Sequence, residues 1–210
     1  AIVGLWRNAT DDPTYPARMS IFHNPGMGGG PTNLEEVAEV ALARRAESTD
    51  KLRMGHVKFV LDGSIQGYTA RVTEPYVTDG NDNGLWLIPP SQFADWIRPI
   101  VEAQVLLHVH CNGDEAVDVL LEAFAEATGG APYGDHRTTI QHCQLTRPEQ
   151  YRRMAELGMC ANLFSNHFWY WGDQHHDLTV GPERAAVMNR ARMALDLDIP
   201  VSIHCDAPVT

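Results

Sequence analysis

The chain has 210 residues, of which 44% are hydrophobic and 20% charged, as is usual for a globular protein rather than a disordered or fibrous one. Its 27 acidic and 16 basic side chains give a net charge of -11, which argues against a nucleic-acid partner because binding a polyanion requires a basic surface. No apolar run approaches the roughly 18 to 20 residues of a membrane span, and no export segment is evident. We therefore expect no membrane contact and a cytoplasmic location, although the chain starts at Ala1, so its natural start could have been removed.

Short apolar runs, typical of buried strands, alternate along the chain with segments of helical spacing. The predicted strands are Arg18–Phe22, His56–Leu61, Gln104–His110, Thr138–Cys143, Gly158–Phe164 and Pro200–Cys205. The predicted helices are Asn33–Glu47, with Thr32 or Asn33 as its N-cap, Ser91–Glu102, Asp114–Thr128, Arg147–Leu157 and Pro182–Leu197. Gly26–Pro31 and Gly129–Gly134 have the composition of loops.

Strands that alternate with helices indicate an α/β fold whose parallel sheet is covered by helices. A complete (β/α)8 barrel takes about 250 residues and eight strands. The predicted strands therefore fit either an open sheet or a barrel without its first two units, and the pattern alone does not choose. The four cysteines form no CxxC pair, and we expect them to be buried reduced thiols.

Several predicted strands end on side chains that can bind metals. In parallel α/β folds reactive groups gather at the carboxyl ends of the strands. One such histidine would be unremarkable, but imidazole and carboxylate groups together suit zinc and similar ions. We expect ligand or catalytic roles for His110, His142 and Asp206 as a set. The full series of strand-end residues is Lys58 with Asp62, His108 and His110, His142, Asn162 with His167, and His204 with Asp206.

Ordered sequence blocks then point to a known family. They are Val57–Ser64 (VKFVLDGS) followed by Thr69-Ala70, His110–Asp114 (HCNGD) with Ala116, Ile140–Gln144 (IQHCQ), Gly181–Arg184 (GPER) and Asp206–Val209 (DAPV). Together they resemble amidohydrolase family 3, the branch of the metal-dependent amidohydrolase superfamily that includes N-substituted formamide deformylases. A match of several blocks in order is a strong signal, whereas any one block alone is weak.

The resemblance implies a distorted (β/α)8 barrel in which the six strands cover the third to eighth units. It places Lys58 on the fourth strand as a carbamylated metal bridge, His110 on the fifth, His142 on the sixth and Asp206 on the eighth. The alternative for Lys58 is an ordinary interior lysine paired with Asp62.

His108-x-His110 could instead be the family's first-strand His-x-His, because alternate residues of a strand face the same side. We reject that assignment, since Gly113-Asp114 and Ala116 match the fifth-strand block and Lys58 would be left upstream. His108 is then a deeper barrel residue.

The sequence departs from the family pattern in ways that bear on activity. The first-strand His-x-His and the flanking small β-domain are absent, so the resemblance implies that residues 1–210 are an incomplete barrel domain and a poor catalyst by itself. Gln141 stands where relatives often have Glu, and His204-Cys205 where they have Gly-Ser. Substrate contacts cannot be carried over at these positions. Unpaired strand edges would also allow homo-oligomers to form.

The segment Asn166–His176 combines aromatic and polar side chains and is predicted to be a loop over the pocket. His167, Trp169 and Trp171 are its candidates for substrate binding, against simple loop packing as the alternative. Asp62 is a further substrate-binding candidate, although a turn or cap role beside Gly63 is the favoured interpretation of its position.

The predicted function is metal-dependent hydrolysis of an amide or other C–N bond in a small molecule. One or two divalent ions, expected to be zinc, would activate a water molecule. Asp206 would serve as general base and then general acid, while His142 and His110 hold one ion and Lys58 bridges to a second. Hydrolysis of esters or phosphoesters, deamination, and a noncatalytic barrel fragment remain alternatives, which metal content would help to separate.

Overall fold

The computed structural model describes residues 2–25, 33–78, 83–131 and 133–207. The predicted loop Gly26–Pro31, the alternative N-cap Thr32, and Pro208 and Val209 of the last family block lie outside these ranges. Within them the chain forms an α/β fold with one parallel sheet in the order β1-β2-β3-β4-β5-β6. The strands are β1 (Met19–His23), β2 (Leu52–Val60), β3 (Leu106–Cys111), β4 (Thr139–His142), β5 (Cys160–Phe164) and β6 (Val201–His204).

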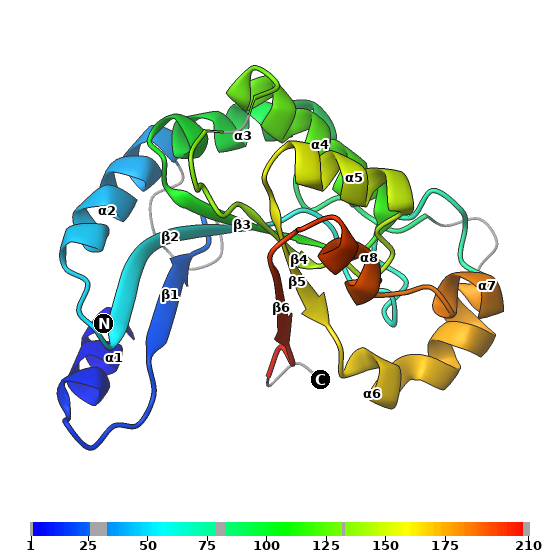
Figure 1. The fold of residues 1–210 in the computed structure, drawn as a ribbon, viewed down its shortest axis with the longest axis horizontal. Helices are drawn as coiled ribbons and strands as arrows, with labels where there is room; N and C mark the ends of the chain where they lie inside the picture. The colour runs from blue at the N-terminus through cyan, green and yellow to red at the C-terminus, as the bar shows by residue number, and fades with distance from the viewer. Residues whose placement is uncertain (1, 26–32, 79–82, 132, 208–210) are drawn as a thin grey trace.

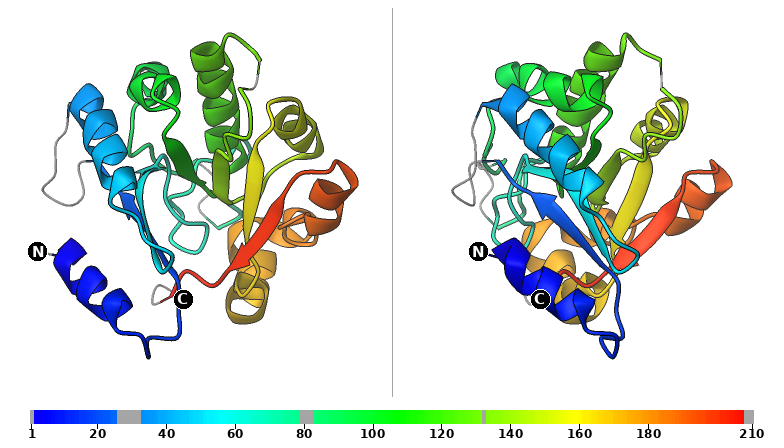
Figure 2. Two further views of the ribbon diagram at one scale, coloured as in Figure 1. Left: turned by 60° about the vertical axis from the view of Figure 1, so that its left-hand side comes forward. Right: turned by 90° about the vertical axis from the view of Figure 1, so that its left-hand side faces the viewer.

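The sheet is curled into a half-barrel, with its helices on the outer, convex side (Figures 1 and 2). This architecture confirms the partial barrel predicted from the sequence. The outer helices are α2 (Leu34–Ala46), α3 (Pro90–Glu102), α4 (Asp114–Thr128), α5 (Pro148–Glu156) and α8 (Ala191–Asp196). All strands run in one direction, so their carboxyl ends meet along one edge of the sheet.

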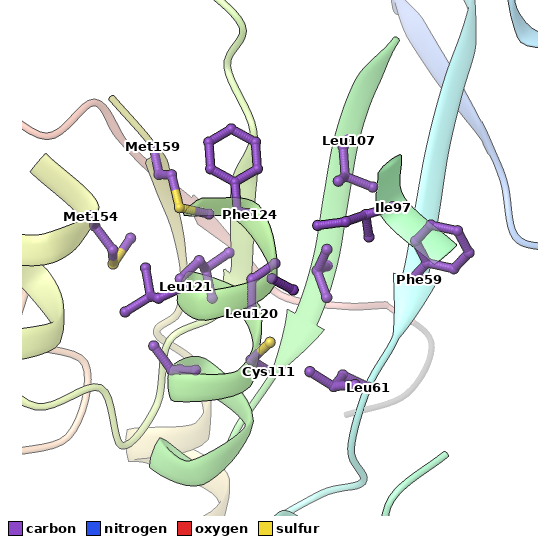
Figure 3. Close-up of a cluster of buried hydrophobic side chains, with 14 of the residues drawn as sticks. Phe59, Leu61, Ile97, Leu107, Cys111, Leu120, Leu121, Phe124, Met154 and Met159 are labelled. Atoms are coloured by element: carbon purple, nitrogen blue, oxygen red, sulfur yellow. The ribbon is translucent and has the colours of Figure 1, made fainter. Parts of the chain in front are cut away.

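The main core lies between the sheet and these helices (Figure 3). Successive strand residues point to opposite faces, and Phe59, Leu107 and Val109 face outward and are fully buried. They pack with helix residues such as Ile97 and Phe124, which are also fully buried. Each such side chain contributes roughly 1.5–3 kcal/mol by leaving water, so burial of this face fixes which side chains are left for the concave side.

A long connection from Asp62 to Pro89 joins β2 to α3 at the carboxyl edge. It carries a second, smaller core with Ile65, Val72 and Tyr76, which packs against Val180. The connection lies directly on Gly113, where an added Cβ would be 1.8 Å from the Arg71 carbonyl oxygen. A side chain at position 113 would therefore push the connection away from the end of β3.

The helix predicted over Pro182–Leu197 is wrong as a single element. The structure divides it into α7 (Gly181–Ala185) and α8 (Ala191–Asp196). Between them Asn189 has a φ of 49° and is buried, with its backbone N–H donating to the Gln144 carbonyl at 3.0 Å. This contact across the fold holds a left-handed residue that ends the helical path.

Helices also form in two segments where none was predicted. Ile2–Asp11 forms α1, to which the sequence analysis assigned no element. The predicted loop Asn166–His176 instead forms helix α6 (His167–Gln174), which continues into the π-helix η1 (His175–Thr179). Aromatic residues are weak helix formers, so burial of one face of this segment outweighs its local propensity.

The four cysteines are free, as expected, but they are not all buried. Cys111 and Cys143 face the core, whereas Cys160 is half-buried on the concave side and Cys205 is exposed beyond the end of β6. The prediction of four buried thiols is wrong for the latter two, because Cys160 lies on the concave side that the helices do not cover and Cys205 lies beyond the end of β6.

Candidate functional site

The concave face of the sheet is rich in polar side chains. Alternation leaves one face of each strand on this side, and hydrogen bonds between neighbouring strands show which residues share it. They are Lys58, His108, His110, Gln141, Asn162, Ser202 and His204. Barrel interiors are usually filled with branched aliphatic side chains. A polar face at this position therefore indicates a site rather than a packed core.

Three histidines meet at the carboxyl edge of this face. His142 Nε2 lies 2.8 Å from Nδ1 of His110, and His142 Nδ1 lies 3.2 Å from Nε2 of His204. His110 Nε2 in turn lies 2.8 Å from the carbonyl oxygen of Gly63. Imidazoles from β3, β4 and β6 thus form one continuous series of contacts.

One set of tautomers satisfies the whole series. A carbonyl oxygen can only accept, so His110 Nε2 carries a hydrogen that it donates to Gly63. His110 Nδ1 then accepts from His142 Nε2–H, which leaves His142 Nδ1 to accept from His204 Nε2–H. In this assignment all three rings are neutral, which is the form of imidazole that binds metals.

Electrostatics keeps the central ring neutral. Burial, followed by the neighbouring His110 and His204, lowers the pKa of His142 well below 6.5. Burial is also the main cause that lowers the pKa of His204, although Asp206 acts in the opposite direction. A neutral His142 at physiological pH is available both as a hydrogen-bond partner and as a ligand.

The backbone of β4 turns His142 into this cluster. Strict alternation would place Gln141 and His142 on opposite faces, and His142 is in register with outward-facing Cys111. His142, however, has a φ of 81°, in the left-handed region that non-glycine residues rarely adopt. Such a conformation costs on the order of 1–3 kcal/mol and is typical of functional sites. The turn brings His142 to the same side as His110 and His204.

Asp62, predicted as a substrate contact or a turn residue, is fully buried. Its carboxylate accepts backbone N–H groups from Arg71 at 3.0 Å, Asn112 at 3.0 Å and Gly113 at 2.8 Å. One of its oxygens also lies 3.3 Å from His110 Nε2. Asp62 therefore ties the connection after β2 to the end of β3 and supports the His110 ring.

Lys58 and Asp206 lie on either side of the histidines. Lys58 is on the concave face of β2, in register with His108, and its charge lowers the pKa of His108, His142 and His204. Asp206 follows β6 with a φ of 54°, and its charge acts on His204 and His167. Within the described residues no hydrogen bond or ion pair joins Lys58 to Asp62, the pairing considered for an ordinary lysine.

Helix α6 presents one stripe to the sheet and another to solvent. His167 is buried, stacks on Phe164 at 3.7 Å between ring centroids, and contacts Gln144 through its Nδ1 at 2.8 Å. Trp171 is half-buried on the same stripe, whereas Trp169 is 86% exposed. Of the substrate-binding candidates on this helix, His167 and Trp171 face the fold and Trp169 faces away from it.

The donor set fits a divalent ion of the zinc type at the His110 and His142 pair. Two nitrogens bound tetrahedrally to one zinc lie about 3.3 Å apart, so this pair would separate by about half an ångström to accept an ion. Across the described part of the chain, no three His, Cys, Asp or Glu side chains are already gathered as they would be around a metal. His110 and His142 are therefore a candidate ligand pair, and their metal-binding role stays a prediction.

Sequence reasoning left several of these contacts unassigned. His204 was noted as a strand-end residue and as a departure from the family pattern, but its direct contact with His142 was not predicted. Buried His175 was grouped with a loop, although His167, Trp171 and His175 recur every four residues, which is the spacing of one helix stripe. That period was the available signal.

Comparison with known proteins adds the family. The model of the amidohydrolase family matches residues 3–210. Among curated proteins, the chain is 24% identical over 180 residues to Protein LONG AFTER FAR-RED 3 of Arabidopsis thaliana, covering 81% of this chain and 31% of that protein. It is 25% identical over 170 residues to the putative amidohydrolase YtcJ of Bacillus subtilis (strain 168), covering 76% and 32%. The chain thus spans about a third of the length of these relatives.

Solved structures share the fold. An uncharacterized metal-dependent hydrolase from Pyrococcus furiosus superposes with a TM-score of 0.79 at 23% identity, over 99% of this chain and 40% of that one. Another from Pyrococcus horikoshii OT3 gives 0.76 at 21% identity, over 100% and 39%. At this identity the likeness concerns the fold alone. Within the described ranges, none of the helices has the length and apolar character needed to cross a bilayer.

Proposed function

The chain belongs to the amidohydrolase family, and from that premise we propose that it contributes the site of a metal-dependent hydrolase that cleaves an amide or another C–N bond. The observation that carries the proposal is the pair of neutral imidazoles, His110 and His142, whose ring nitrogens face each other 2.8 Å apart. Supporting it are the polar concave face and the position of Asp206 at the same edge of the sheet.

The ligands of the proposed ion are His110 Nδ1 and His142 Nε2, with zinc as the expected metal. For both nitrogens to bind an ion, the hydrogen on His142 Nε2 would move to His142 Nδ1, and His204 would take the tautomer whose Nε2 accepts it. Protonation of the rings would compete with the ion, so affinity falls as the pH falls. When bound, a divalent ion of this type polarises the scissile carbonyl and makes water a stronger acid. Lys58, on the neighbouring strand, is the proposed bridge to a second ion if it carries a carbamate.

Asp206 acts as the proton carrier. Its carboxylate takes a proton from the attacking water and later delivers it to the leaving nitrogen, so that the amide yields a carboxylic acid and an amine. The Gly63 carbonyl oxygen and the Asp62 carboxylate fix the orientation of the His110 ring, since both lie near its Nε2, on the opposite side of the ring from Nδ1. His167, a buried ring whose pKa is affected by the Asp206 charge, is proposed to orient the substrate.

Metal binding to the 210-residue chain tests the proposal directly. Cobalt(II) is a suitable probe, because nitrogen ligation gives visible absorption, and zinc should compete for the same site. We expect about one ion per chain, and a rise in thermal stability that grows with metal concentration because the ion binds only the folded state. His110→Gln and His142→Gln should each lower metal affinity at least tenfold.

His56→Gln is the matched control, because His56 is also a half-buried histidine of the concave side but lies nearer the amino ends of the strands. It should leave metal affinity unchanged. Release of amine from N-acyl probes is then measured with the metal-loaded chain and with Asp206→Asn. Metal affinity that is unchanged in His110→Gln and His142→Gln would contradict the proposal. Because residues 1–210 are expected to be a poor catalyst by themselves, probe cleavage is also measured on a chain extended at both ends, and no cleavage there would contradict the hydrolase assignment.

A further inference from the structure

On the concave face, a second series of side-chain contacts runs across β6, β5, β4 and β3, apart from the contacts among His110, His142 and His204. Ser202 Oγ lies 2.9 Å from Asn162 Oδ1, and Asn162 Nδ2 lies 2.6 Å from Gln141 Oε1. Gln141 Nε2 in turn contacts Nδ1 of His108. The register of the sheet sets these contacts, since Gln141 pairs with Asn162 and Asn162 with Ser202. We call these four residues the amide belt.

The amide belt has unused donors whichever way its two amides are oriented. In the orientation above, each NH2 group donates one of its two hydrogens along the belt. If both amides were reversed, Gln141 would donate to Asn162 and Asn162 to Ser202, again with one hydrogen each. Both orientations leave one N–H of Gln141 and one N–H of Asn162 without a partner in the belt.

These two amides line a hollow that Asp206 and His204 also line. The hollow has a volume of about 630 Å3, and its lining includes Gln141, Asn162, Ser165, His204 and Asp206. A substrate held against Asp206 would therefore also adjoin the amide belt. Gln141 is buried and Asn162 is half-buried. A buried donor without an acceptor costs about 1–3 kcal/mol, so a bound group that accepts from the spare N–H of Gln141 is favoured over one that cannot.

We infer that Gln141 and Asn162 form a subsite for a second acceptor oxygen of the substrate, separate from the scissile carbonyl. The group that this subsite would bind is a carboxylate or a carbonyl oxygen, carried on either side of the scissile C–N bond. An N-acyl amino acid and its amide are examples. Lys58, on the same face, adds a positive charge that favours the carboxylate if its amine is free. The inference rests on the proposed function, and it narrows the substrate to amides that carry a further acceptor.

A purely structural belt is the competing explanation, and matched probes separate the two. N-acetylglycine carries a carboxylate, N-acetylglycinamide carries a neutral carbonyl in its place, and N-ethylacetamide carries neither. The side-chain NH2 signals of Gln141 and Asn162 are followed by nitrogen–proton NMR on the 15N-labelled full chain, with assignments from Gln141→Met and Asn162→Leu. This readout does not depend on catalysis.

We expect N-acetylglycine, N-acetylglycinamide or both to shift the two NH2 signals, and N-ethylacetamide to leave them in place. A shift with N-acetylglycine alone identifies a carboxylate subsite, and shifts with both identify a carbonyl oxygen. Gln141→Met and Asn162→Leu should weaken binding of the acceptor-bearing probes about five- to tenfold and change N-ethylacetamide binding less than twofold.

Ser202→Ala is the control within the belt, because it removes one hydrogen bond of the belt but neither unused N–H. It should leave probe selectivity unchanged. Equal responses to all three probes, or NH2 signals that none of them moves, would overturn the subsite. This comparison of probes is made on the unmodified chain, so it stands even if a variant fails to fold. Loss of hydrolysis with the shifts intact would count against the proposed function instead.

Discussion

At the scale of single residues, Asp62 illustrates how a strand-end carboxylate can serve a site without facing it. It is fully buried and accepts three backbone N–H groups from two segments that are far apart in the chain. A carboxylate with these partners holds the end of β3, and with it His110, in a fixed position. This arrangement fits the turn interpretation of Asp62, while its predicted substrate contact stays a prediction.

Substitution of Asp62 tests its positioning role. Asp62→Ala leaves the buried N–H groups of Arg71, Asn112 and Gly113 without an acceptor, and should lower the free energy of unfolding by about 3 kcal/mol or more. Asp62→Asn keeps one acceptor oxygen and should cost about half as much. Urea unfolding of both variants measures the difference. Full stability of Asp62→Ala would show that these backbone groups do not depend on the carboxylate.

At the scale of elements, helix α6 is defined by its buried stripe. His167 and Trp171 face the fold, and His175 continues the stripe into η1 at 5.9 Å from His167 between ring centroids. The opposite face exposes Phe168, Trp169 and Tyr170. Helix α6 follows β5 directly and so lies at the carboxyl edge of the sheet (Figure 1). His167 and Trp171 are the residues that it turns toward this edge.

Two tryptophans on α6 form a matched pair for testing this orientation. Trp171→Ala should lower the free energy of unfolding by about 1–3 kcal/mol, since a half-buried indole loses part of the 3–5 kcal/mol of a fully buried one. Trp169→Ala should change it by less than about 0.5 kcal/mol because that side chain is 86% exposed. Thermal and urea unfolding check both values. Equal losses would mean that the helix is turned differently about its axis.

At the scale of the whole molecule, the fold gathers neutral histidines whose protonation opposes folding. Burial lowers the pKa of His108, His167 and His175 to about 4, from an ordinary value of 6.5. His108 also faces His56 and Lys58, and His167 faces His175, His204 and Asp206. The unfolded chain therefore binds more protons than the folded chain between these two pH values.

Stability should consequently fall as the pH drops from 6.5 toward 4, and these groups should have little effect above pH 6.5. Each such histidine contributes on the order of 2–3 kcal/mol to the loss. His175→Gln should reduce the difference in unfolding free energy between pH 7 and pH 4.5, as measured with urea. His176→Gln, at the neighbouring exposed position, should keep the wild-type difference. If the difference in unfolding free energy between pH 7 and pH 4.5 is unchanged in His175→Gln, then protonation of His175 does not oppose folding.

Sequence spacing by itself determined the alternation of strands and helices, the parallel sheet, and the edge at which His110, His142 and Asp206 would appear. These features follow from local periodicity and from the chain direction of parallel strands. Only the tertiary structure decided that the positive φ of His142 turns it toward His110 and His204, that Asn189 divides the last helical segment, and that the amides of Gln141 and Asn162 join across strands. The reason is that each of these depends on contacts between segments distant in sequence, where burial and hydrogen bonding outweigh the preference of any short stretch.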